Sequence, residues 1–273
     1  MKKIDIHCHS TNRKLKDMLV EDSSLDALMN EMYKHDIEKT VVLATYFPHK
    51  QSGISNFRLS NWIENNPKFV MFGSLDFEHY FYQGYNELEE MADKDMIKGI
   101  KIYTGYQEID LNSDKFSKVV DLARDYSLPL MFHCGYSYAS MRKYGKIAIT
   151  RVLSPGDIEP VAKANEDVNF ILSHLGKPSF DNTREVITHN SNVYTDMSGI
   201  IDSKYHAHEI PMCVDQIKSI LYEAGPKKLL FGTDFPVQTH EHSIRFIEES
   251  MKDFNSEDKQ NVYYENAKRL LKI

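Results

Sequence analysis

Two histidines, His7 and His9, stand one residue apart at the end of the first apolar run, in the sequence KKIDIHCHST. In an extended strand, residues i and i+2 point to the same side, so both imidazoles would project from one face. Imidazole is the commonest metal ligand among protein side chains. The pair alone does not distinguish a metal site from a polar strand end, so further ligands must come from the rest of the chain.

Three more residues with metal-ligating side chains close later apolar runs. His133 ends the run LPLMFHC, His174 lies near the end of NFILSHL, and Asp234 ends KLLFGTD. Three of these four imidazoles together with the carboxylate would suit Zn²⁺, with Mn²⁺ and Fe²⁺ as competitors. The alternative is that each histidine ends a strand for hydrogen-bonding reasons and that the aspartate caps the following helix. Five such residues in equivalent places favour one divalent metal ion.

Eight short apolar runs are the elements that must position these side chains. Most are nearly continuous rather than alternating, which is typical of strands covered on both faces, and segments with helical spacing lie between them. Strands that alternate with helices predict parallel pairing through right-handed crossovers. Eight such units in 273 residues predict a single α/β domain over residues 1–273, a (β/α)8 TIM barrel. A doubly wound open sheet is the alternative, but no glycine-rich phosphate-binding turn follows the first run. The runs are residues 3–9, 40–45, 69–76, 97–103, 128–134, 169–175, 192–198 and 228–234.

Composition narrows the class of protein. Lys and Arg together number 33 and Asp and Glu 40, and the net charge of −7 disfavours unspecific nucleic-acid binding. We expect neither a signal peptide nor a membrane span, because no apolar stretch is long enough. Three cysteines make no disulfide framework and predict a reducing cytoplasm. Cys8 lies between the two histidines of the first run, so strand alternation turns it away from them and we expect a small buried apolar residue.

The motifs DIHCH, FHCG, SHLG and GTDFP, followed by YYENAKRLLKI, resemble the amidohydrolase superfamily in order and spacing. The likeness is closer to the amidohydrolase-related branch, which contains metal-dependent hydrolases and enzymes of the aminocarboxymuconate semialdehyde decarboxylase type. The resemblance implies that His7, His9 and His133 bind a metal ion, and that Asp234 contacts it and acts as a base. It implies that His174 binds a second metal or, where only one metal is present, acts as acid/base or contacts substrate.

This resemblance implies a metal-dependent hydrolase of a small amide, lactone or related carbonyl compound. A bound divalent ion lowers the pKa of water from about 16 towards about 7, so that Asp234 would accept the proton while His174 stabilises the developing oxyanion. A non-oxidative decarboxylase on the same scaffold is the alternative, although His7 favours hydrolysis because some decarboxylases of this branch carry Glu there. A TatD-like nuclease is a weaker alternative, because GIKIY stands where that family has a GEIGLD-like motif. An intact ligand set disfavours an inactive binding protein.

Lys101 and two further His-x-His pairs are the remaining ionisable candidates. Lys101 lies near the end of the fourth run; in binuclear amidohydrolases a lysine at this place is carbamylated and bridges two metals, whereas the alternative is an ion-paired lysine at the barrel mouth. We expect one metal. His206 and His208 lie in the loop after the seventh run, where His206 is a candidate substrate contact. His240 and His242 lie where the last helix begins, and we expect them to be exposed to solvent.

Substrate recognition is expected from the loops that follow the strands. Residues 135–154 form the longest irregular segment, and loops of this kind at a barrel mouth are usually functional. Arginine binds carboxylates in a bidentate fashion, so the expected partner is a small molecule that bears a carboxylate, bound by a monomer or homodimer. The candidate substrate contacts are Arg13, Tyr103, Tyr136, Arg142, Arg151 and His206.

Overall fold

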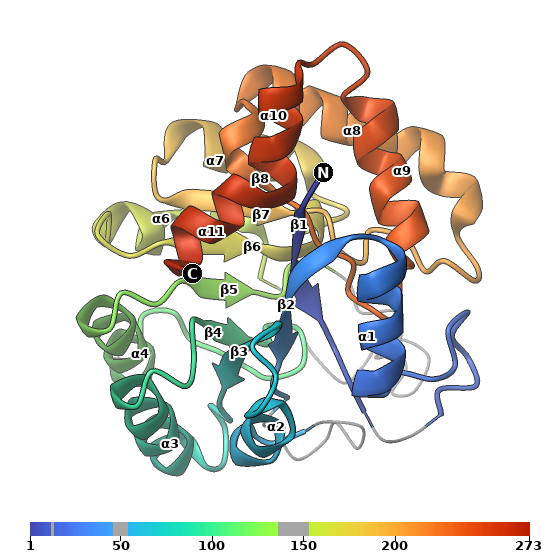
Figure 1. Cartoon of the computed structure of the whole chain (residues 1–273). Coiled ribbons are helices and arrows are strands. Elements are labelled where there is room, and N and C mark those ends of the chain that lie inside the picture. The colour runs from blue at the N-terminus through green and yellow to red at the C-terminus, as the bar shows by residue number, and fades with distance from the viewer. Residues whose placement is uncertain (12–13, 46–53, 136–152) are drawn as a thin grey trace.

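The structure, a computed structural model, describes residues 1–11, 14–45, 54–135 and 153–273. Eight parallel strands form one sheet in the order of the sequence, with helices around it (Figure 1). This is the predicted (β/α)8 barrel, and every strand overlaps the apolar run that predicted it. The strands are β1 (Lys3–Cys8), β2 (Ile37–Leu43), β3 (Phe69–Ser74), β4 (Ile100–Ile102), β5 (Leu130–Phe132), β6 (Phe170–Leu172), β7 (Val193–Asp196) and β8 (Leu229–Leu230).

The barrel closes where the end of β1 meets the segment that follows β8. The backbone N–H of Ile6 donates to Phe231 O at 3.0 Å, and the N–H of Asp234 donates to His7 O at 2.7 Å. These bonds continue the ladder beyond the two residues of β8. They fix Asp234 beside His7, although the two residues are far apart in the sequence.

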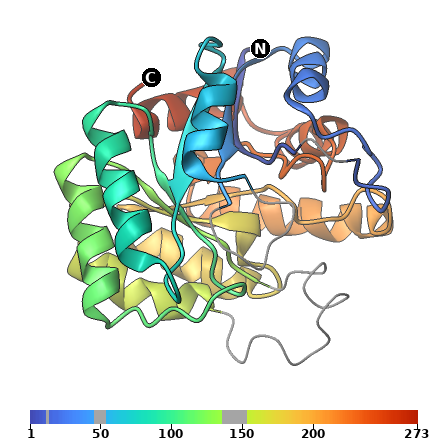
Figure 2. The same cartoon turned by 90° about the horizontal axis from the view of Figure 1, so that it is seen from below.

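Helices alternate with the strands and cover the outside of the barrel (Figures 1 and 2). Figure 2 shows both chain ends on the side of the barrel where β1 begins, away from the ends of the strands. Within the described ranges, no helix is long and apolar enough to cross a membrane. The helices are α1 (Leu25–Lys34), α2 (Asn56–Ile63), α3 (Phe81–Asp93), α4 (Asp114–Asp125), α6 (Pro155–Ala164), α7 (Phe180–His189), α8 (Ile210–Glu223), α9 (His240–Ser250), α10 (Ser256–Gln260) and α11 (Asn266–Leu271), with the short turns η2 (Ser173–Gly176), η3 (Ala207–Glu209), η4 (Pro226–Lys228) and η5 (Asn261–Glu265).

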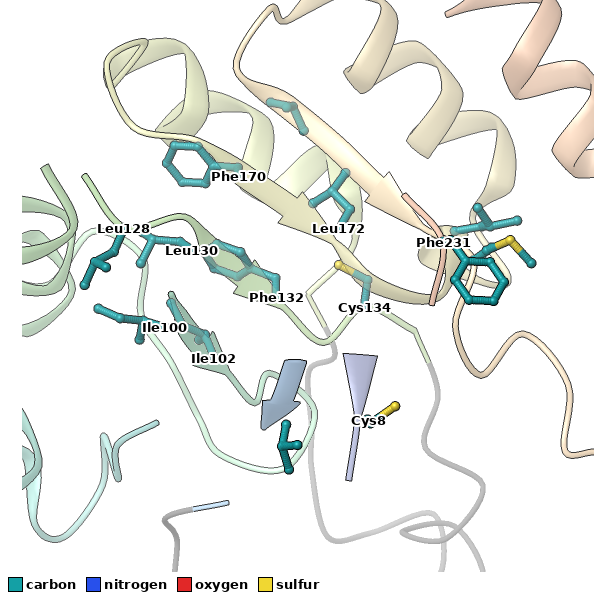
Figure 3. Close-up of a cluster of buried hydrophobic side chains, with 14 of the residues drawn as sticks. Cys8, Ile100, Ile102, Leu128, Leu130, Phe132, Cys134, Phe170, Leu172 and Phe231 are labelled. Atoms are coloured by element: carbon teal, nitrogen blue, oxygen red, sulfur yellow. The ribbon is translucent and has the colours of Figure 1, made fainter. Parts of the chain in front are cut away.

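Successive residues of each strand face opposite sides of the barrel wall, so the strands contribute to two apolar layers. Inside the barrel, Ile6, Phe72 and Ile171 belong to a buried cluster that also includes Leu270 of α11. The other strand positions pack against the helices, and Figure 3 shows part of this outer layer around Phe132. Because both faces of each strand are buried, the runs are nearly continuous in apolar residues. A rigid barrel of this kind leaves its strand ends to carry the polar side chains.

Candidate active site

The five residues at the ends of the predicted runs come together at the carboxyl end of the barrel. His7 lies in β1 and His9 just beyond it, and His133 directly follows β5. His174 belongs to the turn η2 after β6, and Asp234 follows β8. Parallel barrel strands all end on one face, which is where barrel enzymes place their chemistry.

The first group of these side chains, which we term the mouth cluster, consists of His7, His9 and Asp234. The Oδ1 atom of Asp234 lies 3.4 Å from His7 Nε2 and 3.2 Å from His9 Nε2. Ligand atoms of the three residues lie within 4.8 Å of one another. The Nε2 atom of His7 is buried and forms no hydrogen bond with the described residues. A buried polar atom without such a bond is costly unless a ligand satisfies it, so this donor set fits the predicted metal ion.

Two of the site residues have a left-handed backbone, with φ of 62° at His174 and 57° at Asp234. Non-glycine residues rarely adopt this conformation, and it persists at sites where the surrounding structure holds it. Gly199, with φ of 56°, lies against both residues. A Cβ atom on Gly199 would lie 2.5 Å from Asp234 Oδ2 and 3.0 Å from His174 Nδ1, so only glycine fits beside these side chains.

His133 and His174 form a second contact at the barrel mouth. His174 Nε2 lies 3.0 Å from His133 Nδ1, and His174 Nδ1 lies 2.7 Å from the carbonyl oxygen of Ser198. Behind them lies Asp196, the last residue of β7, whose Oδ2 is 3.0 Å from His7 Nδ1. Sequence reasoning did not select Asp196, although it is a polar residue that closes the β-strand in the run NVYTDMS. The rule that selected the five site residues would have found it.

Burial and neighbouring charge set the protonation of the site. Burial lowers the pKa of His7, and the ammonium group of Lys101 lowers it further. Burial also lowers the pKa of His174. For Asp234, burial raises the pKa, but the hydrogen bond from His9 and the imidazoles of His7 and His174 outweigh it and hold the pKa of the carboxyl well below its usual range. At neutral pH His7 and His174 are neutral and Asp234 is ionised, which are the forms that bind metals.

A cavity of about 290 Å³ adjoins these residues. His9, His133, His174 and Asp234 contribute to its lining. The remaining lining combines apolar side chains with hydroxyl groups, so the cavity suits a small molecule with both apolar and polar parts. These other residues are Ser10, Thr11, Leu15, Met18, Ser23, Thr45, Tyr103, Tyr106, Pro236 and Val237.

The whole chain matches a known family. A family model described as "Amidohydrolase" matches residues 4–273. The chain belongs to the amidohydrolase family. Among curated proteins, no sequence matches it. Membership confirms the resemblance drawn from the four motifs and the prediction of an enzyme, and it indicates a divalent metal ion.

Solved structures of low sequence identity share the fold of this amidohydrolase. A "probable 2-pyrone-4,6-dicarboxylic acid hydrolase" from Acinetobacter baumannii, with citric acid bound, is 14% identical with a TM-score of 0.71 over 100% of both chains. A zinc-bound amidohydrolase from Burkholderia multivorans is 15% identical with a TM-score of 0.70, again over 100% of both chains. A 5-carboxyvanillate decarboxylase from Sphingomonas paucimobilis is 14% identical with a TM-score of 0.69 over 100% of this chain and 99% of that chain.

The other predicted site residues of this amidohydrolase differ in their placement. Lys101 is buried in β4, where its Nζ donates to Ser173 Oγ at 2.8 Å. Tyr103 lines the cavity and its hydroxyl donates to Ala44 O at 2.7 Å. His206 lies in the segment after β7 and is not among the described residues that line the cavity. Four predicted substrate contacts lie outside the described residues: Arg13, Tyr136, Arg142 and Arg151.

The expectation that His240 and His242 are exposed is wrong. His240, the first residue of α9, is fully buried and its Nε2 lies 3.2 Å from Asp5 Oδ2. His242 is half-buried, with its Nδ1 2.8 Å from Ser203 Oγ. The first turn of α9 packs against the junction of β1 with the segment after β8, a contact that helical spacing alone does not reveal.

Proposed function

We propose that the chain is a metal-dependent hydrolase that acts on a small amide, lactone or related carbonyl compound in the cytoplasm. The observation that carries this proposal is the mouth cluster, in which metal-ligating atoms from both ends of the chain lie within 4.8 Å of one another beside a cavity. Membership of the amidohydrolase family supports the class of reaction. The three cysteines are all free and buried, which supports a reducing compartment.

His7, His9, His133 and Asp234 are the proposed ligands of one divalent ion. Zinc is the proposed metal because imidazole nitrogens and a carboxylate oxygen are its preferred ligands alongside thiolates, with Mn²⁺ and Fe²⁺ as competitors. The zinc-bound structure from Burkholderia multivorans supports this choice. When bound, the ion supplies a Lewis acid that polarises a carbonyl group and makes water more acidic.

Asp234 is the proposed base. Its carboxylate is ionised at neutral pH and lines the cavity, so it can accept a proton from water and return it to the leaving group. His174 lines the same cavity and is proposed to contact the developing oxyanion. To donate to the oxyanion, His174 Nε2 must first gain a proton and give up its hydrogen bond with His133 Nδ1.

The cavity favours a small substrate. Its volume of about 290 Å³ is close to the lower end of the range of roughly 300–1,000 Å³ for small-molecule pockets. Leu15, Met18 and Val237 suit a ring or alkyl group. A substrate carboxylate would require a cation such as Arg13 or Arg142, and this part of the proposal rests on the sequence alone.

A non-oxidative decarboxylase is the second candidate. The fold that this chain shares with 5-carboxyvanillate decarboxylase supports keeping it. In that reaction His174 or Asp234 would deliver a proton to the carbon that loses CO₂, whereas hydrolysis consumes water and releases an acid. The two candidates therefore differ in their products.

Metal analysis and two product assays test the proposal. Protein purified without chelator is expected to hold one divalent ion per chain, and chelation is expected to abolish turnover. Lactones, beginning with 2-pyrone-4,6-dicarboxylate, report hydrolysis through acid release to a pH indicator, and aromatic acids, beginning with 5-carboxyvanillate, report decarboxylation through CO₂. Asp234→Asn should be inactive, whereas His208→Ala, at an exposed histidine, should keep full activity. CO₂ as the sole product would replace the hydrolase by the decarboxylase, and protein without stoichiometric metal would contradict both.

A further inference from the structure

Asp196 and Ser198, at and just after the end of β7, contact the histidines of the candidate active site. Asp196 is fully buried, and its Oδ2 lies 3.0 Å from His7 Nδ1. Its Oδ1 accepts hydrogen bonds from the backbone N–H groups of His174 and Ser198, both at 3.0 Å, and from the Ser198 hydroxyl at 2.5 Å. Asp196 thus contacts the side chain of one site histidine and the backbone of another.

These contacts decide which nitrogen of His7 carries a proton. A carboxylate offers only hydrogen-bond acceptors, so His7 Nδ1 must be the donor to Asp196 Oδ2. The Ser198 oxygen lies 2.9 Å from the same Nδ1 and has already given its proton to Asp196, so it also accepts. In a neutral imidazole only one nitrogen bears hydrogen, and the lone pair of His7 therefore lies on Nε2.

The same reasoning extends from Ser198 to His174 and His133. His174 Nδ1 must donate to the carbonyl oxygen of Ser198 at 2.7 Å, which leaves its Nε2 as an acceptor. The partner of that Nε2 is His133 Nδ1 at 3.0 Å, so His133 Nδ1 must carry the proton. The lone pair of His133 then also lies on Nε2.

We infer that the end of β7, through Asp196 and Ser198, is the element that fixes the tautomers of His7, His174 and His133, so that His7 and His133 both present a basic Nε2. The inference rests on the proposed function, because His7 and His133 are two of the residues proposed to bind the ion. Asp196 and Ser198 are positioning residues, since they act through the histidines. Hydrogen bonds of this kind orient metal-binding imidazoles and raise their basicity.

Asp196→Asn tests the inference because the carboxylate offers an acceptor both to the donors at Oδ1 and to His7 Nδ1, whereas an amide offers one acceptor and one donor. The amide oxygen is expected to remain at the Oδ1 position, where three donors converge, so the NH₂ group faces His7 Nδ1. His7 Nδ1 must then accept, and its proton moves to Nε2. We expect zinc affinity, measured by competition with a chromophoric chelator, to fall by about 10- to 100-fold. We also expect ¹⁵N NMR of the metal-free, histidine-labelled variant to report Nε2–H at His7.

Asp76→Asn is the matched control. Asp76 is also buried, and its Oδ1 accepts the backbone N–H groups of Glu78 at 2.9 Å and His79 at 3.1 Å. Its zinc affinity should equal that of the wild type. The wild-type spectrum is a second measurement that holds even if Asp196→Asn does not fold, because it should report Nδ1–H at His7, His133 and His174.

Two results would overturn the inference: Nε2–H at His7 or His133 in the metal-free wild type, or an Asp196→Asn variant that keeps wild-type zinc affinity. Failure of the wild type to bind zinc or another divalent ion has a different meaning. It would refute the proposed function, while the wild-type tautomers would still decide whether β7 sets the proton positions.

Discussion

Two groups of metal-ligating side chains include residues of strand β1. One is the mouth cluster, which adjoins the cavity. The other, which we term the Asp5 cluster, consists of Asp5, Cys8 and His240 between the barrel wall and α9. In both groups a carboxylate lies next to imidazole, and the ligand atoms are within 4.8 Å of one another. Residue types and distances alone do not distinguish them.

The hydrogen bonds of the carboxylate and the thiol do distinguish them. In the Asp5 cluster, Oδ1 of Asp5 accepts the N–H groups of His7 and Thr233, both at 3.1 Å. Its Oδ2 accepts the Thr233 hydroxyl at 2.7 Å and the Cys8 thiol at 3.1 Å, and lies 3.2 Å from His240 Nε2. Burial and the Asp5 charge raise the pKa of the Cys8 thiol, which therefore stays protonated as a donor. An ion would have to displace this entire network.

An unbonded imidazole nitrogen does not separate the two clusters, because both ring nitrogens of His240, like His7 Nε2, are buried without a hydrogen bond to the described residues. The clusters differ in the donors that already satisfy both oxygens of Asp5 and in the cavity, which only the mouth cluster adjoins. The Asp5 cluster instead ties the backbone at His7 to the backbone at Thr233, the neighbour of Asp234. One cluster is therefore suited to bind a ligand, and the other holds in place the two segments that carry the first.

The largest expected effect is on zinc affinity and turnover, and it concerns the mouth cluster. His9→Ala removes a mouth-cluster side chain that is partly exposed, so little packing is lost. We expect zinc affinity to fall by more than the roughly 10- to 100-fold typical of losing an outer-shell partner, with turnover falling in parallel. The melting temperature of the metal-free protein should stay near the wild-type value. Wild-type zinc content in His9→Ala would remove His9 from the ligand set.

The next effect is on stability and concerns the Asp5 cluster. Asp5→Ala leaves several buried donors unsatisfied, so we expect the free energy of unfolding to fall by about 3–5 kcal/mol. Urea denaturation of the metal-free protein measures it. The matched control is Asp76→Ala, whose carboxylate also accepts two backbone N–H groups and should cost less. Equal losses in the two variants would contradict the network described for Asp5.

The sequence predicted the barrel and the five strand-end residues because both depend on local patterns. Continuous apolar runs predict strands that are buried on both faces, and a polar residue at the end of such a run predicts the barrel mouth. The sequence predicts the register and the length of the strands less well: β8 has two residues, whereas the apolar run that predicts it has seven. Its continuation is set by bonds to β1, which no local pattern encodes.

Residues that act as hydrogen-bond acceptors were harder to predict. Asp5 and Asp196 acquire their roles from donors that lie far away in the sequence, such as Thr233 and His174. His240 looked like an exposed residue at a helix start, and only the packing of α9 against β1 buries it. Such roles depend on which elements touch, and a single sequence does not specify those contacts.

A smaller effect concerns the shape of the mouth cluster. In Gly199→Ala the new Cβ would lie 2.5 Å from Asp234 Oδ2, so the carboxylate must move. A misplacement of about 1 Å can lower turnover by roughly 100-fold, and we expect a loss of this order in kcat. Gly225→Ala is the control, because its φ is also positive at 87° but the new Cβ would meet no described atom within 4 Å. That variant should lose about 1 kcal/mol of stability through backbone strain and keep its activity. Full activity in Gly199→Ala would show that Asp234 tolerates displacement.

The smallest expected effect tests whether the Asp5 cluster binds an ion after all. Cys8→Ala removes one donor to Asp5 Oδ2, and Cys213→Ala removes another fully buried thiol, in α8, as the matched control. The two variants lose the same atoms, so the difference between their free energies of unfolding isolates the contacts of the Cys8 thiol. We expect Cys8→Ala to be less stable by about 1 kcal/mol, with the ratio of zinc to protein unchanged in both. A ratio of two ions per chain in the wild type that falls to one in Cys8→Ala, and not in Cys213→Ala, would make the Asp5 cluster a second metal site.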